Sequence, residues 1–126
     1  MIFKNILVVG IGGGLGSIAR FLCQKYISAW HPHPFPFGTF LVNILGCFLI
    51  GMFYALAEKG NILTPEWRLF LTTGICGGFT TFSSFAYENV SLLRSGDFLY
   101  FGFYTAGSVF LGIVATFGGI ALLKLI

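Results

Sequence analysis

Charged residues are too few in this sequence for a chain that folds in water. Of its 126 residues, 9% are Asp, Glu, Lys or Arg, whereas 56% are hydrophobic and 18% are aromatic. Soluble domains carry about 25% charged residues, and disordered chains combine low hydrophobicity with high net charge. The composition therefore excludes both classes and predicts an integral membrane protein. The length predicts one domain, residues 1–126, with about four spanning helices, because each crossing of the hydrocarbon needs roughly 20 apolar residues.

Three polar or proline-rich breaks divide the chain into four apolar segments. Three prolines interrupt residues 31–36, and each removes an amide donor and disfavours helical geometry in the residue before it. Residues 58–61 and 95–97 are typical of turns, and Thr64 followed by Pro65 is typical of a helix start. The sequence thus predicts an all-α fold with transmembrane helices at residues 3–27, 38–57, 65–94 and 98–123.

The positive charges are almost balanced between the two predicted sides of the membrane. One side would hold Lys4, Lys59, Arg68 and Lys124, and the other Arg20, Lys25 and Arg94. Because an excess of Lys and Arg on the cytoplasmic side normally sets orientation, this balance raises the hypothesis that the chain inserts both ways and pairs as an antiparallel dimer. The alternative is that Arg20 lies too deep to count and a weak bias fixes one orientation. The charges are also scattered, so nucleic acid is not an expected partner.

A glycine-rich series lies within the first predicted helix, at residues 10–16. The series lacks the spacing of a dinucleotide-binding loop. Within a spanning helix, Gly10 with Gly14 and Gly12 with Gly16 are four residues apart, which predicts close approach of another helix. In the fourth segment Ser108, Gly112 and Thr116 have the same spacing, and their hydroxyls could alternatively line a polar track.

Residues 74–85 are unusually rich in glycine and hydroxyl side chains for the middle of a spanning helix. Non-helical backbone at this depth is tolerated only inside protein or beside a water-filled cavity. An interruption around residues 77–80 would free carbonyl oxygens, which suit a small hard cation. Plain glycine packing explains the same residues equally well, so the pattern leaves both interpretations open.

Phe82 and Phe85 lie three residues apart, so they share a helix face one turn before Glu88. The positive edge of a phenyl ring can stabilise an anion more weakly than Arg would. Most of the 16 phenylalanines must nevertheless face lipid or other helices, and spacing alone favours that simpler role. Asn43 is the lone amide of the second segment, so it must point inward, to cross-link helices or to bind a ligand. His31 and His33 are too few for a metal site.

Three of these motifs together are similar to the Fluc (CrcB) family of fluoride channels. They are Gly-Gly-Gly-Leu-Gly-Ser-Ile-Ala-Arg at residues 12–20, Gly-Thr-Phe-Leu-Val-Asn at 38–43, and Gly-Ile-Cys-Gly-Gly-Phe-Thr-Thr-Phe-Ser-Ser-Phe at 74–85. The resemblance covers essentially the whole chain. This sequence has Ser84 at a position where many members carry Thr, so the hydroxyl is retained.

The resemblance implies a dual-topology antiparallel homodimer in the bacterial inner membrane, with a broken third helix, that exports cytoplasmic fluoride passively. It implies that a structural Na⁺ at the dimer interface is held by backbone carbonyls, matching Gly77 and Thr80. It further implies a fluoride pathway whose matching residues are Asn43, Phe82, Phe85, Tyr104 and Ser108. Supporting roles for Thr39, Ser84, Glu88 and Arg20 are left open.

Two other classes of membrane protein compete with this interpretation. A small dual-topology multidrug or cation exporter also has four spans, but it needs a carboxylate at membrane depth, which the known families place in the first helix. The first segment here has no Asp or Glu. A purely structural membrane subunit is disfavoured by the polar series in the third segment.

Overall fold

The computed structural model describes residues 1–30, 34–60 and 62–126 and is helical throughout its regular structure. Residues 31–33, which include both histidines and the first of the three prolines, and Asn61 lie outside the described residues. The seven elements in chain order are α1 (Ile2–Trp30), α2 (Phe37–Ala57), α3 (Pro65–Leu69), the π-helical η1 (Phe70–Cys76), α4 (Gly77–Phe79), α5 (Phe82–Arg94) and α6 (Phe98–Leu125).

Within the described residues, these elements form four segments that can span a membrane, which confirms the number predicted from the sequence. The helices long and apolar enough to cross a membrane are Ile2–Trp30, Phe37–Ala57, Pro65–Arg94 and Phe98–Leu125, the third made up of α3, η1, α4 and α5 in a row. The described ends lie within a few residues of the predicted ones. No strand occurs in the described part of the chain.

The helix ends follow the local signals that predicted them. At the start of α3 the Thr64 hydroxyl accepts a hydrogen bond from the Trp67 amide at 3.2 Å, and Pro65 occupies the first turn. At the end of α5, Gly96 adopts a left-handed conformation with φ of 78°. The amides of Gly96 and Asp97 then donate to the carbonyls of Leu93 and Leu92, which closes the helix in a Schellman motif.

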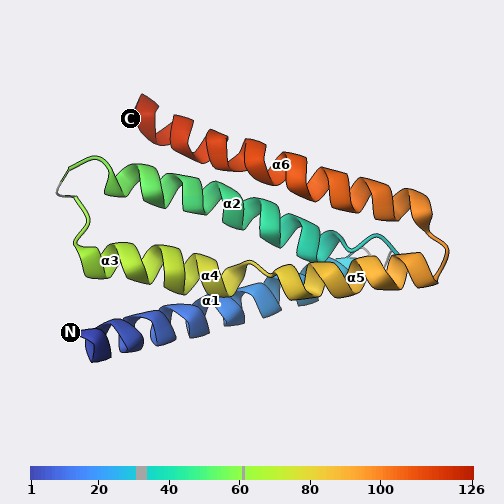
Figure 1. The fold of residues 1–126 in the computed structure, drawn as a ribbon, viewed down its shortest axis with the longest axis horizontal. Coiled ribbons are helices and arrows are strands. Elements are labelled where there is room, and N and C mark those ends of the chain that lie inside the picture. Colours follow the sequence, from blue (N-terminus) through green and yellow to red (C-terminus); the bar gives the residue numbers. More distant parts are fainter. Residues whose placement is uncertain (31–33, 61) are drawn as a thin grey trace.

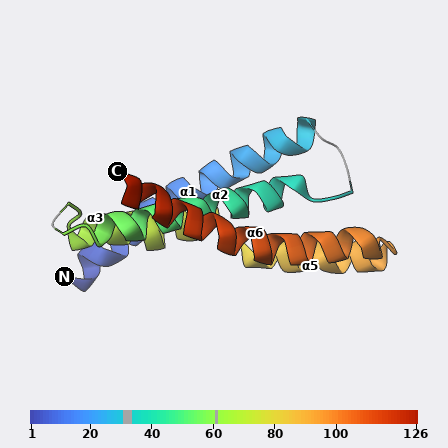
Figure 2. The same cartoon turned by 90° about the horizontal axis from the view of Figure 1, so that it is seen from above.

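The spans pack so that both chain termini and the connection from α2 to α3 lie at one end of the molecule (Figure 1). The connection from α5 to α6 lies at the opposite end in both views (Figure 2). α1 packs mainly on η1 and α4, and α2 mainly on α6. The largest fully buried side chains are Val42, Cys76 and Tyr104.

Glycines make the contact between α1 and the third span very close. A Cβ atom added at Gly12 would lie 2.9 Å from both the Gly74 Cα and the Phe70 carbonyl oxygen. A Cβ at Gly16 would overlap the Ile75 carbonyl. Gly10 and Gly14 instead have open space within 4 Å, so the predicted close approach involves only one of the two glycine pairs. The reason is geometric, since the two pairs are offset by two residues, or about 200° around the helix.

Glycines also bring α2 and α6 into close contact. A Cβ at Gly51 would overlap the Thr116 carbonyl, and a Cβ at Gly119 would overlap the Phe48 carbonyl. The Thr116 hydroxyl donates to the Gly112 carbonyl within its own helix at 3.0 Å, and Gly112 is buried near the Cys47 sulfur. Gly112 and Thr116 therefore serve helix packing.

Gly16→Ala should destabilise the protein by about 1–3 kcal/mol, because the new methyl group must push the backbone of η1 away from α1. Gly14→Ala, two residues away in open space, should leave stability unchanged or raise it by less than about 1 kcal/mol through better helix propensity. SDS-induced unfolding in mixed micelles measures both variants. An equal loss of stability in the two would contradict the described placement of the glycines.

Candidate functional site

The third span is not helical at Thr80 and Thr81. Both residues have extended backbone, with ψ of 157° at Thr80 and φ of −149° at Thr81. Gly77–Phe79 is helical, so the non-helical residues lie slightly later than the interval 77–80 indicated by the sequence. Each threonine hydroxyl closes one adjoining helix end: Thr80 donates to the Cys76 carbonyl at 2.9 Å, and Thr81 accepts from the Ser84 amide at 3.2 Å.

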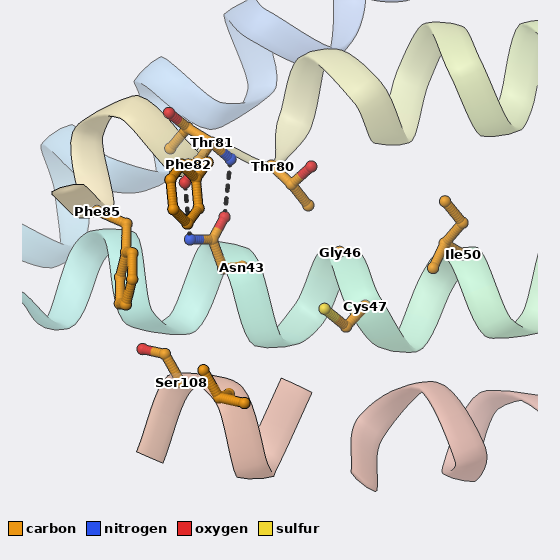
Figure 3. Close-up of a pocket in the computed structure, with 10 residues that line it drawn as sticks. Asn43, Gly46, Cys47, Ile50, Thr80, Thr81, Phe82, Phe85 and Ser108 are labelled. Carbon is orange, nitrogen blue, oxygen red and sulfur yellow. Dashed lines mark hydrogen bonds between the residues drawn. The ribbon is translucent and has the colours of Figure 1, made fainter. Parts of the chain in front are cut away.

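Asn43 on α2 pairs with the extended backbone through both ends of its amide. Its Oδ1 accepts from the Thr81 amide at 2.8 Å, and its Nδ2 donates to the Thr81 carbonyl at 3.0 Å. Figure 3 shows this pair of bonds and the ring of Phe82 beside them. The side chain therefore cross-links two spans, one of the two roles that its position predicted. Since Nδ2 carries two hydrogens, a second donor is left over after the bond to Thr81.

Because Asn43 binds the Thr81 backbone, two carbonyls in the preceding turn of helix lose their usual helical donors. The Thr81 amide, four residues after Gly77, would close a helical bond to the Gly77 carbonyl, but it donates to Asn43 instead. The next carbonyl, of Gly78, accepts from the Arg20 Nε at 3.1 Å. Arg20 thus supports the interrupted span from α1, a contact that no sequence pattern specified.

A pocket of about 350 Å³ lies next to the interruption, between α2, α5 and α6. Its walls are mainly apolar, and its lining residues are Asn43, Gly46, Cys47, Ile50, Thr80, Thr81, Phe82, Phe85, Ser108 and Val109. Four of the five residues assigned to a pathway from the sequence therefore meet here: Asn43, Phe82, Phe85 and Ser108.

Two phenylalanine rings, an amide and three hydroxyl side chains line this pocket, and no cationic side chain is among its lining residues. The ring centroids of Phe82 and Phe85 are 5.7 Å apart, and the angle between the ring planes is 44°. The two rings therefore lie on one face of α5, as their spacing predicted. Phe82 is 78% exposed, so it faces out of the single chain. The Ser108 hydroxyl points toward Phe85 in Figure 3. It is shielded from solvent and has no hydrogen-bond partner among the described residues.

Tyr104, the fifth predicted pathway residue, lies behind Phe85 and does not line the pocket. It is completely buried, and its ring centroid is 4.9 Å from that of Phe85. Its hydroxyl donates to Oε1 of Glu88 at 2.9 Å. The sequence could not place this ring, because helical spacing does not distinguish a pocket wall from the layer behind it.

A chain of hydrogen bonds continues from Tyr104 toward α1. Oε2 of Glu88 accepts from the Thr39 hydroxyl at 2.9 Å, and that hydroxyl accepts from Nε2 of Gln24 at 3.0 Å. Glu88 also lines a second, more polar pocket of about 350 Å³, which lies near the C-terminal end of α5 and the N-terminal end of α6. The role of Gln24 was not predicted from the sequence, although an amide within a predicted spanning helix was the available signal.

Asn43→Leu should strip the Thr81 amide and carbonyl of their partners, which costs about 1–3 kcal/mol for each buried group left unsatisfied. Hydrogen exchange at the Thr81 amide should become markedly faster. Leu45→Ala, at an exposed position of the same helix, is the matched control and should leave that exchange rate unchanged. Wild-type protection of Thr81 in Asn43→Leu would refute the assigned pairing.

Comparison with known proteins identifies relatives along nearly the whole chain. The family described as CrcB-like protein, Camphor Resistance (CrcB), matches residues 7–120. A protein of Flavobacterium psychrophilum is 46% identical over 121 residues, covering 96% of this chain and 98% of its own. A protein of Chlorobaculum tepidum is 50% identical over 125 residues, covering 99% and 98%. One of Chlorobium luteolum is 51% identical over 120 residues, covering 95% and 92%.

All three relatives carry the name fluoride-specific ion channel FluC. The matched residues 7–120 include the glycines of α1, Asn43, the extended residues of the third span and the pocket-lining part of α6. With four spanning helices and a match over this length, the chain belongs to the CrcB family.

Proposed function

We propose that this protein is a fluoride-selective ion channel of the bacterial inner membrane, which lets cytoplasmic fluoride leave the cell passively and so protects it from fluoride toxicity. The observation that carries the proposal is the pocket beside Thr81. It combines two phenylalanine rings, a spare amide donor and a hydroxyl without a partner, and no cationic side chain lines it. The names of the full-length relatives support the same function.

The residues that line the pocket suit weak, transient binding of an anion, as conduction requires. Ring edges and neutral donors attract an anion more weakly than Arg or Lys, and weak sites favour conduction. Asn43 offers its second amide hydrogen, and Ser108 offers its hydroxyl, to replace part of the water that the ion gives up. A narrow path with these donors favours the small fluoride ion over chloride.

Passive export is sufficient for protection because of the chemistry of hydrogen fluoride. The neutral acid crosses membranes from acidic surroundings and dissociates inside the cell, where the anion is trapped. A fluoride pore lets the inside-negative potential drive the anion out, with about 2.3 kcal/mol per charge for each 100 mV. The pore itself then needs no energy source.

The functional unit that we propose is an antiparallel homodimer of chains inserted in opposite orientations, each with a broken third helix at Thr80 and Thr81. The near balance of positive charge between the two ends of the chain supports dual topology. The exposure of Phe82 supports a dimer, because a pathway residue that is 78% exposed on one chain needs another surface to enclose it.

A structural Na⁺ at the interface between the two copies is part of the proposal. Gly77 is exposed, and its carbonyl has lost the helical donor that Thr81 would provide, so an oxygen is available for a hard cation. The extended backbone of Thr80 offers a second carbonyl. One chain would supply these two oxygens, and the inverted copy would supply two more. When bound, the ion would contribute a fixed positive charge and hold the two interrupted spans together.

Phe82→Ile and Phe85→Ile should each slow fluoride efflux by at least about tenfold, because isoleucine fills space but lacks a positive ring edge. Efflux from liposomes containing purified protein is followed with a fluoride electrode. Phe117→Ile, at an exposed position of α6, is the matched control and should conduct like wild type. Wild-type flux in both pocket variants, or equal release of fluoride and chloride by the wild type, would defeat the proposed function.

Dual topology is tested by placing one cysteine at each end of a chain whose native cysteines are replaced by alanine. Glu58→Cys in the connection from α2 to α3 and Ser95→Cys in the connection from α5 to α6 are exposed, lie in connections at opposite ends of the molecule (Figure 1), and leave every Lys and Arg in place. A membrane-impermeant thiol reagent added outside should label about half of the copies at either position, since both orientations coexist. Labelling of one position alone would establish a single orientation and exclude the antiparallel dimer.

A further inference from the structure

Phe35, in the connection between α1 and α2, is the centre of an aromatic cluster. Its ring centroid lies 5.4 Å from that of Tyr104, 5.6 Å from that of Phe40 and 6.1 Å from that of Tyr100. The corresponding angles between the ring planes are 76°, 76° and 79°. These three are edge-to-face contacts, the arrangement that the ring quadrupole favours. A tilted contact at 4.8 Å joins it to Phe37. A connecting residue is thus packed onto side chains of both α2 and α6.

The backbone around Phe35 is constrained by two prolines and by a tight turn. Proline precedes and follows it, and a residue before proline is restricted to extended geometry. The Phe37 amide donates to the Phe35 carbonyl at 2.8 Å, and Pro36 between them has φ of −79° and ψ of 72°. These values define an inverse γ-turn. The turn leads directly into α2, since the Phe40 amide donates to the Pro36 carbonyl at 3.1 Å.

The ring contacts continue from Phe35 to the pocket. Tyr104 is completely buried, and its ring centroid lies 5.4 Å from that of Phe35 and 4.9 Å from that of Phe85. The Tyr104 hydroxyl is fixed separately by its hydrogen bond to Glu88. Tyr104 is therefore held at its hydroxyl by Glu88 and at its ring by Phe35, with the Phe40 ring farther away at 6.4 Å.

We propose that Phe35 is a positioning residue of the anion pathway, which holds the ring of Tyr104 and through it the ring of Phe85 at the pocket wall. The inference rests on the proposed channel function. A wall built of ring edges works only while each ring keeps its angle to the ion. Phe85 needs support on the side away from the pocket, and Tyr104 provides it only while its own ring is held.

Phe35→Leu should slow fluoride efflux per reconstituted channel by about tenfold, while Phe35→Tyr, which keeps the ring, should stay within about twofold of wild type. Phe98→Leu is the matched control, because Phe98 is exposed at the start of α6 near the same end of the molecule. The rate per channel is normalised to the fraction of liposomes that release fluoride, so a variant that only folds less well gives fewer active liposomes with an unchanged rate.

A double variant tests whether the effect runs through Tyr104. Tyr104→Phe keeps the ring and removes the bond to Glu88, so combining it with Phe35→Leu removes both the hydrogen bond and the Phe35 ring contact and leaves the more distant Phe40 contact. The double variant should be slower than the product of the two single effects predicts.

Two results would overturn this inference: a Phe35→Leu rate equal to that of Phe98→Leu, or single effects that simply multiply in the double variant. A wild-type protein that releases no fluoride would instead overturn the proposed function itself, so the two failures are distinguishable.

Discussion

A backbone that crosses hydrocarbon must find all its hydrogen-bond partners within the protein, because each group left without one costs several kcal/mol. In this chain that constraint is most demanding at Thr81, where the third span is extended. The Asn43 amide meets it by presenting one acceptor and one donor to the Thr81 backbone, as another peptide group would. The pocket depends on this pairing, since the extended residues set where α5 begins and therefore where Phe82 and Phe85 lie.

Close helix contacts make that pairing possible. The glycines of α1 let η1 and α4 approach until a Cβ at Gly78 would overlap the Gly13 carbonyl. At this separation Arg20 reaches the Gly78 carbonyl and supplies a donor that the helix no longer offers. Behind the pocket, Tyr104 contacts two groups of residues: its hydroxyl donates to Glu88, and its ring packs in the aromatic cluster around Phe35. Both groups are thus connected to the pocket wall through Tyr104, whose ring contacts Phe85.

Periodicity and local signals predicted the four spans, the Thr64 cap and the inward orientation of Asn43, because each depends on neighbours in the sequence or on the absence of water. The contact of Gln24 with Thr39 and that of Arg20 with Gly78 could not be predicted, since they join spans whose relative rotation no local signal specifies. The same reason explains why Gly14 lies in open space while Gly16 is buried, and why Tyr104 stands behind Phe85 although spacing favoured neither place.

The central claim is that a pocket of ring edges and neutral donors conducts fluoride in preference to chloride. The reversal potential of the purified protein in a planar bilayer tests it most directly, with a tenfold fluoride gradient across the membrane and equal chloride on both sides. The account predicts a reversal potential near 59 mV in magnitude, the value for a pore permeable to one monovalent ion alone. A reversal potential near zero under this gradient, or one that follows an imposed chloride gradient, would contradict it.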